Sequence, residues 1–453
     1  MRRKVVLYNP KAVFHTMPLA LVAIGSGFDP QRYDLRIVDG RLERDPLAAL
    51  QREVNGAVCL GISVLTGAPI LDALRASRMT KATHPEVPVV WGGWHPSLFP
   101  TDTLAEPSVD ITVAGQGEET FGELVQRLAE GEELAGLKGI CFRSGEEVVT
   151  NPPRPLIDMN ELPAHDYDLV PVERYFEAKG QRQLDYISST GCYFRCAFCA
   201  DPFVFKRGWV ALTPERMGEE IERHWRRYQF TELAFQDETF FTYDKRVEAI
   251  AEEFLGRNLR FAWTATMRAD QGARLNEATF ELCVRSGLRR LMIGVESGSQ
   301  EMLDWMKKDI TLEQVLECAE ICVRHGVGAI FPFIVGFPDE REAGVRATLG
   351  LAKRLRSLSP SFETPIFYFK PYPGSAITQD MVAKGYQLPD SLKSWADFDF
   401  IGSSGPWVTE ELERYVERFK FYNRFAGGPE SWLRWPLQQL ARWRCRRDCY
   451  SLP

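Results

Sequence analysis

The sequence alternates short β-branched runs with longer helical segments, and this alternation constrains the fold more than any other feature. Such a pattern predicts parallel strands joined by crossover helices, with ligands bound beyond the carboxyl ends of the strands. We therefore predict an α/β protein in which residues 1–150 form a doubly wound, Rossmann-like parallel sheet. Its expected strands are 4–8, 34–38, 57–63, 87–91, 111–114 and 140–142, and its expected helices include 47–54, 70–80 and 119–130.

A second alternation follows a proline-rich stretch at residues 151–184, which we interpret as a linker. Six successive strand–helix units in residues 185–385 predict a partial or full α/β barrel, which we take as a partial (β/α)6 barrel of the TIM type, with its chemistry on the loops after the strands. Residues 386–453 are expected to form a small helical C-terminal region. The expected barrel strands are 185–189, 232–236, 260–266, 290–296, 328–335 and 363–369, and the expected helices are 214–228, 244–255, 278–286, 312–326 and 342–355.

The composition excludes several classes of protein. The chain has 453 residues, a net charge of −7 and 45% apolar residues, which is enough for two or three packed domains. The acidic balance argues against a nucleic-acid-binding protein. No apolar run approaches the roughly 20 residues needed to cross a bilayer, and the N-terminal residues do not resemble an export signal. We therefore expect a cytoplasmic protein whose ten cysteines are mostly reduced thiols.

Three of these cysteines lie in one loop after the expected strand 185–189. Cys192, Cys196 and Cys199 have the spacing Cys-x3-Cys-x2-Cys, and thiolates in one loop suit an iron–sulfur cluster or zinc. The next cysteine along the chain is Cys283, so no fourth cysteine is close in sequence. Three ligands on a four-iron cluster would leave one iron open to a substrate or cofactor. The spacing alone leaves both an open [4Fe-4S] cluster and a three-cysteine zinc site as alternatives.

Further motifs follow the triad along the predicted barrel. An aromatic residue, Phe198, precedes the last cysteine. Together with the segments below, the triad resembles the radical S-adenosylmethionine (SAM) superfamily. The segments are 234–240 (Ala-Phe-Gln-Asp-Glu-Thr-Phe), 268–270 (Arg-Ala-Asp), 294–298 (Gly-Val-Glu-Ser-Gly), 333–338 (Phe-Ile-Val-Gly-Phe-Pro) and 370–374 (Lys-Pro-Tyr-Pro-Gly).

This resemblance implies a [4Fe-4S] cluster on the three cysteines, an open iron that chelates SAM, and reductive cleavage of SAM to a 5′-deoxyadenosyl radical. It places Asp237 and Glu238 at the methionine amino group, although the family's usual Gly-Gly-Glu is absent there. Arg268 would pair with the methionine carboxylate. Glu296 and Ser297 would contact the ribose and the methionine. The electron would come from a donor such as flavodoxin or ferredoxin.

The first sheet carries a second resemblance. Segments 63–65 (Ser-Val-Leu) and 92–93 (Gly-Gly) resemble those of cobalamin-binding domains, in which the nucleotide tail of the corrinoid lies along the sheet. The family's usual Asp-x-His-x-x-Gly is absent and His15 lacks its neighbours, so we expect cobalt without a histidine ligand from this chain. The domain order resembles the cobalamin-dependent radical SAM subgroup. The residues expected to contact cobalamin are Ser63, Leu65, Thr66, Gly92, Gly93, Gly115 and Gly117.

These resemblances imply a C-methyltransferase, in which a 5′-deoxyadenosyl radical activates an unactivated carbon and methylcobalamin supplies the methyl group. A radical SAM oxidative cyclase or rearrangement enzyme with the same cofactors is an alternative that the motifs do not separate. A corrinoid-binding sensor or carrier with a structural zinc site is an alternative of another class. No catalytic side chain is assigned. We expect a small-molecule substrate, lipid-like or a natural-product intermediate, and no nucleic acid.

The C-terminal region mixes tryptophan, leucine and arginine. A helix of this composition can lie on an anionic membrane surface. Because Pro436 limits the helix length, we expect the tail to pack against its own barrel, with peripheral membrane contact through the tail as the alternative. The residues of this pattern are Trp432, Leu433, Trp435, Leu437, Leu440 and Trp443, interleaved with Arg434, Arg442, Arg444, Arg446 and Arg447.

Overall fold

The computed structural model describes residues 2–398, 405–426 and 435–450. The chain forms two compact units, each assembled from separate stretches of sequence. The first unit comprises residues 1–193, 200–234 and 379–399, and the second comprises residues 194–199, 235–378 and 400–453. The predicted α/β class is confirmed, and the predicted domain boundaries stay predictions.

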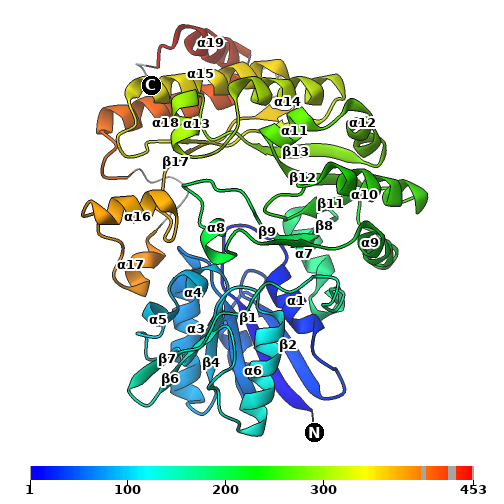
Figure 1. Cartoon of the computed structure of the whole chain (residues 1–453), viewed down its shortest axis with the longest axis vertical. Coiled ribbons are helices and arrows are strands. Elements are labelled where there is room, and N and C mark those ends of the chain that lie inside the picture. Colours follow the sequence, from blue (N-terminus) through cyan, green and yellow to red (C-terminus); the bar gives the residue numbers. More distant parts are fainter. Residues whose placement is uncertain (1, 399–404, 427–434, 451–453) are drawn as a thin grey trace. The chain divides into compact units, whose positions relative to one another are not determined.

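A seven-stranded sheet forms the centre of the first unit (Figure 1). Its strands are β1 (Arg3–Asn9), β2 (Tyr33–Asp39), β3 (Ala57–Ser63), β4 (Val89–Gly92), β5 (Ile111–Val113), β6 (Ile140–Ser144) and β7 (Glu147–Thr150). The spatial order is β2-β1-β3-β4-β5-β6-β7. Strands β1 to β5 pair in parallel, and the strand order changes direction between β1 and β3. In doubly wound sheets this switch point marks the ligand crevice.

The last two strands depart from the prediction. The expectation that residues 140–142 extend the parallel sheet is wrong, because β6 pairs antiparallel with β5 and β7 pairs antiparallel with β6. After helix α6 (Glu118–Glu130) an irregular connection, residues 131–139, leads into β6 from the opposite end of the sheet. Gly145, with φ +63°, then provides the tight turn into β7.

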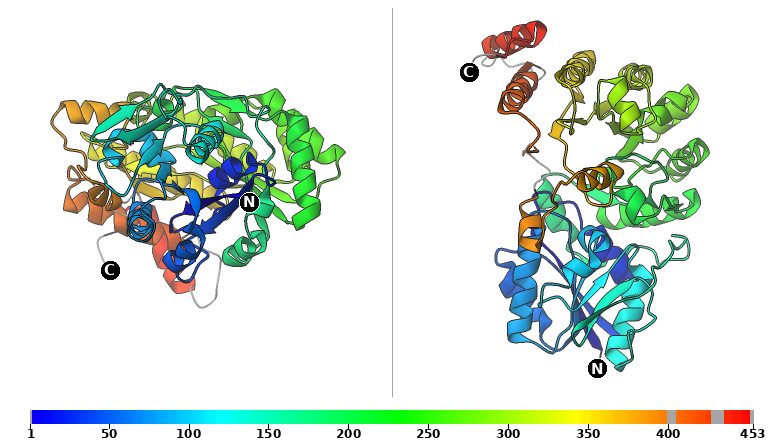
Figure 2. Two further views of the ribbon diagram at one scale, coloured as in Figure 1. Left: turned by 90° about the horizontal axis from the view of Figure 1, so that it is seen from below. Right: turned by 60° about the vertical axis from the view of Figure 1, so that its left-hand side comes forward.

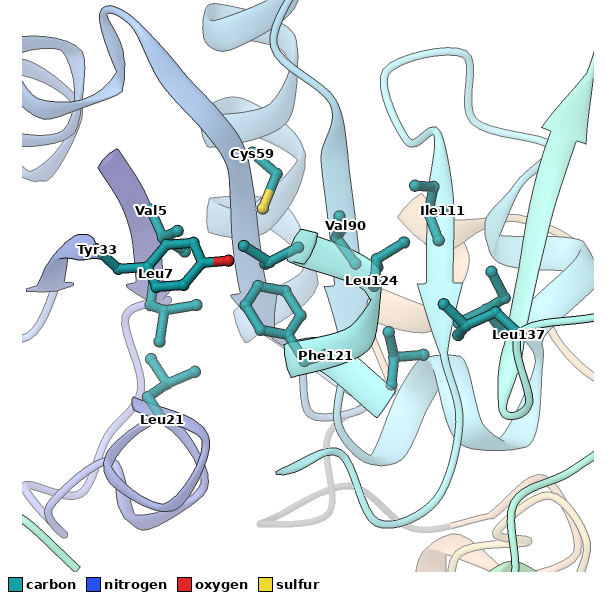
Figure 3. Close-up of a cluster of buried hydrophobic side chains, with 13 residues drawn as sticks. Val5, Leu7, Leu21, Tyr33, Cys59, Val90, Ile111, Phe121, Leu124 and Leu137 are labelled. Atoms are coloured by element: carbon teal, nitrogen blue, oxygen red, sulfur yellow. The ribbon is translucent and has the colours of Figure 1, made fainter. Parts of the chain in front are cut away.

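Helices cover both faces of this sheet. Helix α1 (Leu19–Ser26) packs with α6, and helix α2 (Pro46–Val54) packs with α3 (Pro69–Thr83). Figure 3 shows Leu21, Phe121 and Leu124 from α1 and α6 facing apolar side chains of the strands. Cys59 belongs to this core, and burial raises the pKa of its thiol to about 12, which keeps it protonated. Two short helices, α4 (Trp94–Leu98) and α5 (Pro100–Thr103), lie between β4 and β5 in sequence.

The later part of the first unit contains short strands and helices. Strand β8 (Gln183–Tyr186) lies beside β11 (Glu232–Phe235), and β9 (Ser189–Gly191) pairs antiparallel with β10 (Trp209–Ala211). Helix α9 (Pro214–Tyr228) has the predicted bounds, because Thr213 accepts a hydrogen bond from the Arg216 amide and Pro214 begins the first turn. The other elements are η1 (Tyr167–Leu169), α7 (Val172–Lys179), α8 (Asp201–Val204), α17 (Leu392–Ala396) and α16 (Ala376–Ala383), of which α16 contributes residues to both units.

Parallel strands also form the second unit. Strands β12 (Ala262–Arg268), β13 (Leu288–Gly294), β14 (Gly328–Ile330) and β16 (Phe362–Glu363) pair in this order, and β15 (Phe333–Val335) pairs with β17 (Ile366–Tyr368). The succession of strands and helices agrees with the predicted barrel-type domain. The helices are α10 (Asp244–Gly256), α11 (Ala269–Arg274), α12 (Glu277–Arg285), α13 (Gln300–Trp305), α14 (Leu312–Arg324), α15 (Glu342–Leu358), α18 (Glu410–Ala426) and α19 (Trp435–Arg447).

Two strands predicted as continuous are each broken in two. The predicted strand 328–335 divides into β14 and β15, and the predicted strand 363–369 divides into β16 and β17. Pro332 and Pro365 stand at the two breaks. Proline has no N–H to donate to a neighbouring strand, so the hydrogen-bond ladder is interrupted at both positions.

Helices α18 and α19 of the C-terminal region pack within the second unit, as expected, whereas residues 386–398 belong to the first unit. Helices α18 and α19 contact each other (Figure 2). Lys353 of α15 donates to the carbonyl of Cys445 at 3.1 Å, and Arg444 donates to the hydroxyl of Tyr422 at 2.7 Å. Trp432, Leu433 and Arg434 lie outside the described residues. Within the described part of the chain, no helix combines the length and apolar character that crossing a bilayer requires.

Candidate active site

The three cysteines of the triad lie close together in sequence after β9. Cys192 directly follows β9, and Cys196 and Cys199 lie in residues 194–199 of the second unit, here named the cysteine segment. None of the three forms a disulfide, and all three are partly exposed. They are therefore more accessible to a metal cluster than the buried cysteines of the core.

Backbone hydrogen bonds hold the middle of the cysteine segment in place. The Ala197 amide donates to the Met306 carbonyl at 2.7 Å, and the Ala197 carbonyl accepts from the Ile377 amide at 3.0 Å. The Cys199 amide donates to the Cys196 carbonyl at 3.2 Å, which closes a tight turn between these two cysteines. The backbone of the segment is thus fixed by the second unit's own residues.

Arg268 lies at the end of β12 and contacts the cysteine segment directly. Its Nη1 donates to the Sγ of Cys196 at 3.4 Å, its Nε donates to Asp270 at 2.9 Å, and its Nη2 donates to the Lys308 carbonyl. The guanidinium carbon lies 3.7 Å from the ring centre of Phe194. The predicted partner of Arg268 was a SAM carboxylate; in the structure its donors bind Asp270, a backbone carbonyl and a cysteine of the triad.

Glu296 follows β13 and forms a buried ion pair with Lys308. The Lys308 Nζ donates to the Glu296 Oε1 at 2.7 Å, and the residues are 6% and 8% exposed. Glu296 has φ +68°, which is uncommon for a residue with a side chain and is often found at functional sites. Burial alone would lower the pKa of Lys308, but the negative charges of Glu296 and Cys196 outweigh it, so the pKa is raised and the ammonium stays protonated.

Lys308 is the site residue that sequence reasoning missed. It follows α13 in a Lys-Lys-Asp sequence that matches no motif. Its neighbour Lys307 is exposed, whereas Lys308 is buried. Two adjacent lysines look alike in sequence, so only the fold shows which one reaches Glu296.

Ser297 has a different environment from the one predicted. Its hydroxyl lies 3.1 Å from the hydroxyl of Thr348 on α15, and it accepts a hydrogen bond from the Ser299 amide at 3.1 Å. The Gly298 amide donates to the same Thr348 hydroxyl at 3.0 Å. Ser297 is 1% exposed. It therefore fixes the turn between β13 and α13 against α15.

The two acids after β11 differ in burial. Asp237 is 2% exposed, and its carbonyl accepts a hydrogen bond from the Thr266 hydroxyl on β12 at 2.8 Å. Glu238 is exposed. The sequence leaves both acids as candidates for the SAM amino group, and the difference in exposure favours Glu238.

The segments predicted to bind cobalamin meet at one edge of the first sheet. Ser63 ends β3 and Gly92 ends β4. The Val64 amide donates to the Gly92 carbonyl at 2.8 Å, which joins the two segments. Gly93 has φ +93°, and a Cβ there would lie 3.0 Å from the Val64 nitrogen and 3.2 Å from the Ser63 hydroxyl. Only glycine fits this close approach.

A third turn joins this edge through a serine. The Gly115 amide donates to the Ser97 hydroxyl at 2.9 Å, and that hydroxyl donates to the Gly93 carbonyl at 2.7 Å. Gly115 has φ +77°, and a Cβ there would meet no atom within 4 Å, so this turn faces open space. Gly117 precedes α6, and a Cβ there would lie 3.4 Å from Ile24. Gly117 therefore lies against α1.

The residues after β3 differ in their surroundings. Leu65 is 50% exposed. The Thr66 hydroxyl lies 3.2 Å from the Nδ1 of His95 and is already engaged. His95 is fully buried, and burial lowers the pKa of its imidazole to about 4. Leu65 is thus open to a ligand, whereas Thr66 bonds within the protein.

The loop after β1, residues 10–18, adds an apolar surface at the switch point. Val13 is 76% exposed and Phe14 is 60% exposed. Arg41 donates to the Phe14 carbonyl at 2.8 Å and forms an ion pair with buried Asp39 at 2.6 Å. The loop backbone is therefore held while its apolar side chains face solvent. His15 lies partly exposed in the same loop. Val13 and Phe14 were not among the residues predicted to contact cobalamin.

Comparison with known proteins identifies the family. The B12 binding domain family model matches residues 3–125, and the radical SAM superfamily model matches residues 186–352. An uncharacterized methyltransferase of Pyrococcus horikoshii is 30% identical over 414 residues, which cover 90% of this chain and 88% of that protein. The chain belongs to the cobalamin-dependent radical SAM family.

Two other proteins are also similar. An anaerobic magnesium-protoporphyrin IX monomethyl ester cyclase of Rubrivivax gelatinosus is 26% identical over 328 residues, which cover 71% of this chain and 58% of the cyclase. The solved structure of the radical SAM methyltransferase TsrM from Kitasatospora setae, with cobalamin and a [4Fe-4S] cluster bound, has a TM-score of 0.72 and 18% identity. The match covers 86% of this chain and 76% of TsrM, and it shows a shared fold.

Family membership identifies the chain as a radical SAM enzyme and decides against the zinc-containing carrier. Its cofactors are a [4Fe-4S] cluster, SAM and cobalamin. The donor chemistry fits the cluster, because three cysteines that form no disulfide occur in one loop and are partly exposed. Among the described residues, no three His, Cys, Asp or Glu side chains are arranged to hold a single metal ion. The glycine turns and exposed apolar side chains of the first sheet fit a large corrinoid.

Proposed function

We propose that this enzyme methylates an unactivated carbon of a small molecule. The observation that carries the proposal is a B12-binding domain and a radical SAM domain in one chain, together with a relative spanning 90% of it that is named a methyltransferase. When bound, the cofactors would supply a 5′-deoxyadenosyl radical for hydrogen abstraction and a cobalt-carried methyl group. The protein's own contribution is to hold the three cofactors and to exclude water from the radical.

In this proposal Cys192, Cys196 and Cys199 ligate the cluster. Glu238 rather than Asp237 meets the SAM amino group, because its side chain is exposed. The roles of the remaining site residues are proposed from the contacts that each makes in the structure. Arg268 holds the sulfur of Cys196 by a hydrogen bond, Glu296 is held by Lys308 and contacts the SAM ribose, and Ser297 fixes the turn that carries Glu296.

Cobalamin is proposed to bind along the carboxyl edge of the first sheet. The backbone at Gly92, Gly93 and Gly115 would lie against the ligand, and Leu65 would pack on it. Ser63 stands beside Gly93 at this edge. Thr66 and Gly117 would act indirectly, through His95 and α1 respectively. Exposed Val13 and Phe14 extend the apolar surface that the ligand would cover.

Comparative metabolite analysis tests the reaction. A strain lacking the gene is expected to accumulate a compound that differs from a wild-type product by one CH2 unit. Anaerobically reconstituted enzyme, given that compound, a low-potential reductant and methyl-labelled SAM, should form labelled product and 5′-deoxyadenosine. The cyclase relative favours a second function, ring closure. A product that has lost hydrogen and gained no label would establish that alternative and contradict methyl transfer.

The outer face of α19 supports a further proposal about where the substrate is presented. Its inner face packs on α18, while Trp435, Leu437, Leu440 and Trp443 are 44–58% exposed. The exposed side chains Arg446 and Arg447 share this helix, and an apolar surface with arginines suits an anionic lipid surface.

We propose peripheral membrane contact through α19 and a lipid-like substrate. Flotation with anionic phosphatidylserine vesicles should recover the protein, and neutral phosphatidylcholine vesicles should recover much less. Trp443→Ser with Arg447→Ser should abolish flotation. Exposed Trp305 on α13 provides the control Trp305→Ser, which should float like wild type. Equal recovery of all variants would contradict the membrane contact.

A further inference from the structure

Two buried cations border the cysteine segment within the second unit. Arg268 lies over the ring of Phe194 and donates to the Sγ of Cys196. Lys308 lies 5.8 Å from the ring centre of Phe198. The two cations are themselves joined, because Arg268 donates to the backbone carbonyl of Lys308. The segment that carries Cys196 and Cys199 is thus flanked by fixed positive charge.

Each cation is matched with one carboxylate. Arg268 pairs with Asp270 at 2.9 Å, and Lys308 pairs with Glu296 at 2.7 Å. The side chains of Lys308 and Glu296 are 7% and 11% exposed, so water screens this pair little. Charges in such a poorly solvated region act strongly on a nearby redox centre. Removing either member of the Lys308–Glu296 pair therefore leaves the other as an uncompensated charge beside the cysteine segment.

We propose that Lys308 is a positioning residue that sets the reduction potential of the cluster and holds the Glu296 side chain in place for SAM. The inference rests on the proposed role of Cys196 as a cluster ligand. The chemical step is the uptake of one electron by the oxidised cluster from a low-potential donor of the flavodoxin or ferredoxin class. The ammonium of Lys308 stabilises the added negative charge, and it stays protonated throughout.

The two members of the pair give opposite predictions. In Lys308→Met the Glu296 carboxylate loses its partner, the surroundings become more negative, and reduction becomes harder. In Glu296→Gln the ammonium loses its partner, the surroundings become more positive, and reduction becomes easier. A purely structural role would not produce shifts of opposite sign. Lys307→Met is a matched control, because that adjacent lysine is exposed and its charge is screened by water.

The experiment is a dithionite titration of the reconstituted full-length protein without SAM, followed by electron paramagnetic resonance. We expect Lys308→Met to make the equilibrium constant for reduction about tenfold less favourable, equivalent to about 59 mV for one electron. Glu296→Gln should make the same equilibrium constant more favourable by a similar factor. Lys308→Arg and Lys307→Met should keep the wild-type potential.

The outcomes separate this inference from the proposed function. A wild-type protein that takes up no iron and sulfide would overturn both. A cluster whose potential does not move in either variant, or moves in the same direction in both, would overturn the inference alone. If the Lys308→Met protein fails to hold a cluster, the Glu296→Gln variant still tests the inference, because it keeps the lysine. A reduction potential that does not shift in the predicted direction in Glu296→Gln would then overturn the inference.

Discussion

The Nη1 of Arg268 donates a hydrogen bond to the Sγ of Cys196 across 3.4 Å, although the two residues are 72 positions apart in sequence. The contact ties the end of β12 to the cysteine segment. A guanidinium N–H directed at the sulfur forms a charge-assisted hydrogen bond. Arg268 therefore holds the sulfur of one ligand position in place before any cluster is present.

Arg268→Lys should weaken cluster retention. Lysine keeps the charge but cannot reproduce the planar fork that binds Asp270, Cys196 and the Lys308 carbonyl while stacking on Phe194. Loss of a charge-assisted hydrogen bond of about 1.5 kcal/mol should speed iron loss to a chelator about tenfold. The measurement is the decay of the cluster's visible absorbance under anaerobic conditions.

Arg195→Lys is the matched control for that experiment. Arg195 lies in the same cysteine segment and forms an ion pair with Asp309 at 2.8 Å, but both side chains are about half exposed. Exposed pairs contribute little, so iron loss should keep its wild-type rate. Equal rates for Arg268→Lys and Arg195→Lys would rule out a special role for Arg268.

Two glycines around Glu296 should respond differently to alanine. A Cβ at Gly298 would press against the backbone carbonyl of Ala347 in α15, which cannot move without shifting the helix. A Cβ at Gly294 would lie 2.9 Å from the ends of the Glu296 and Lys308 side chains, which have more freedom. We expect Gly298→Ala to reduce the free energy of unfolding by about 3 kcal/mol and Gly294→Ala by about 1 kcal/mol. Urea unfolding of both variants checks this order, and a larger loss for Gly294→Ala would contradict it.

Buried His95 should make the protein sensitive to mild acid. Its pKa is lowered to about 4 by burial, whereas an unfolded histidine titrates near 6.5. Between these values the unfolded chain binds a proton that the folded chain does not, so stability falls as the pH drops from about 6.5 towards 4. The full loss from this residue is about 3 kcal/mol.

His95→Gln should make the pH dependence of stability shallower. Thermal unfolding of wild type and variant between pH 7.5 and 5 compares the slopes, so any constant effect of the substitution cancels. His15, which lies partly exposed in the loop after β1, provides the control His15→Gln and should leave the slope unchanged. Parallel curves for wild type and His95→Gln would show that this imidazole does not carry the effect.

The sequence predicted local features of the fold well. The bounds of α9 follow from Thr213 and Pro214, which act on their own helix, and β3 follows from its continuous apolar run. The breaks at Pro332 and Pro365 were missed, although both prolines are local signals that a strand's hydrogen-bond ladder is interrupted. The antiparallel direction of β6 could not be predicted from local sequence, because it depends on where a long irregular connection returns to the sheet.

The candidate site was predictable only in part. The sequence spacing identifies Cys192, Cys196 and Cys199 as candidate cluster ligands, because three cysteines in one loop are close in sequence. The Lys308–Glu296 pair joins residues 12 positions apart across a helix and a turn, and no periodicity links them. Ser297 shows another limit, since it lies in a recognisable motif, yet in the structure its hydroxyl contacts that of Thr348 on α15.

The exposed loop after β1 yields a test of cobalamin binding. Phe14 is 60% exposed at the switch point of the first sheet, so its side chain contributes little to folding in the free protein. If cobalamin covers it, the buried ring should stabilise the complex by about 1.5 kcal/mol, and Phe14→Ser should weaken binding about tenfold. Val148→Ser, at a 42% exposed position on β7, is the control and should bind normally. Cobalamin affinity is measured by absorbance after equilibrium dialysis, and thermal unfolding should be the same for both variants and wild type. Unchanged affinity in Phe14→Ser would place the corrinoid away from this loop.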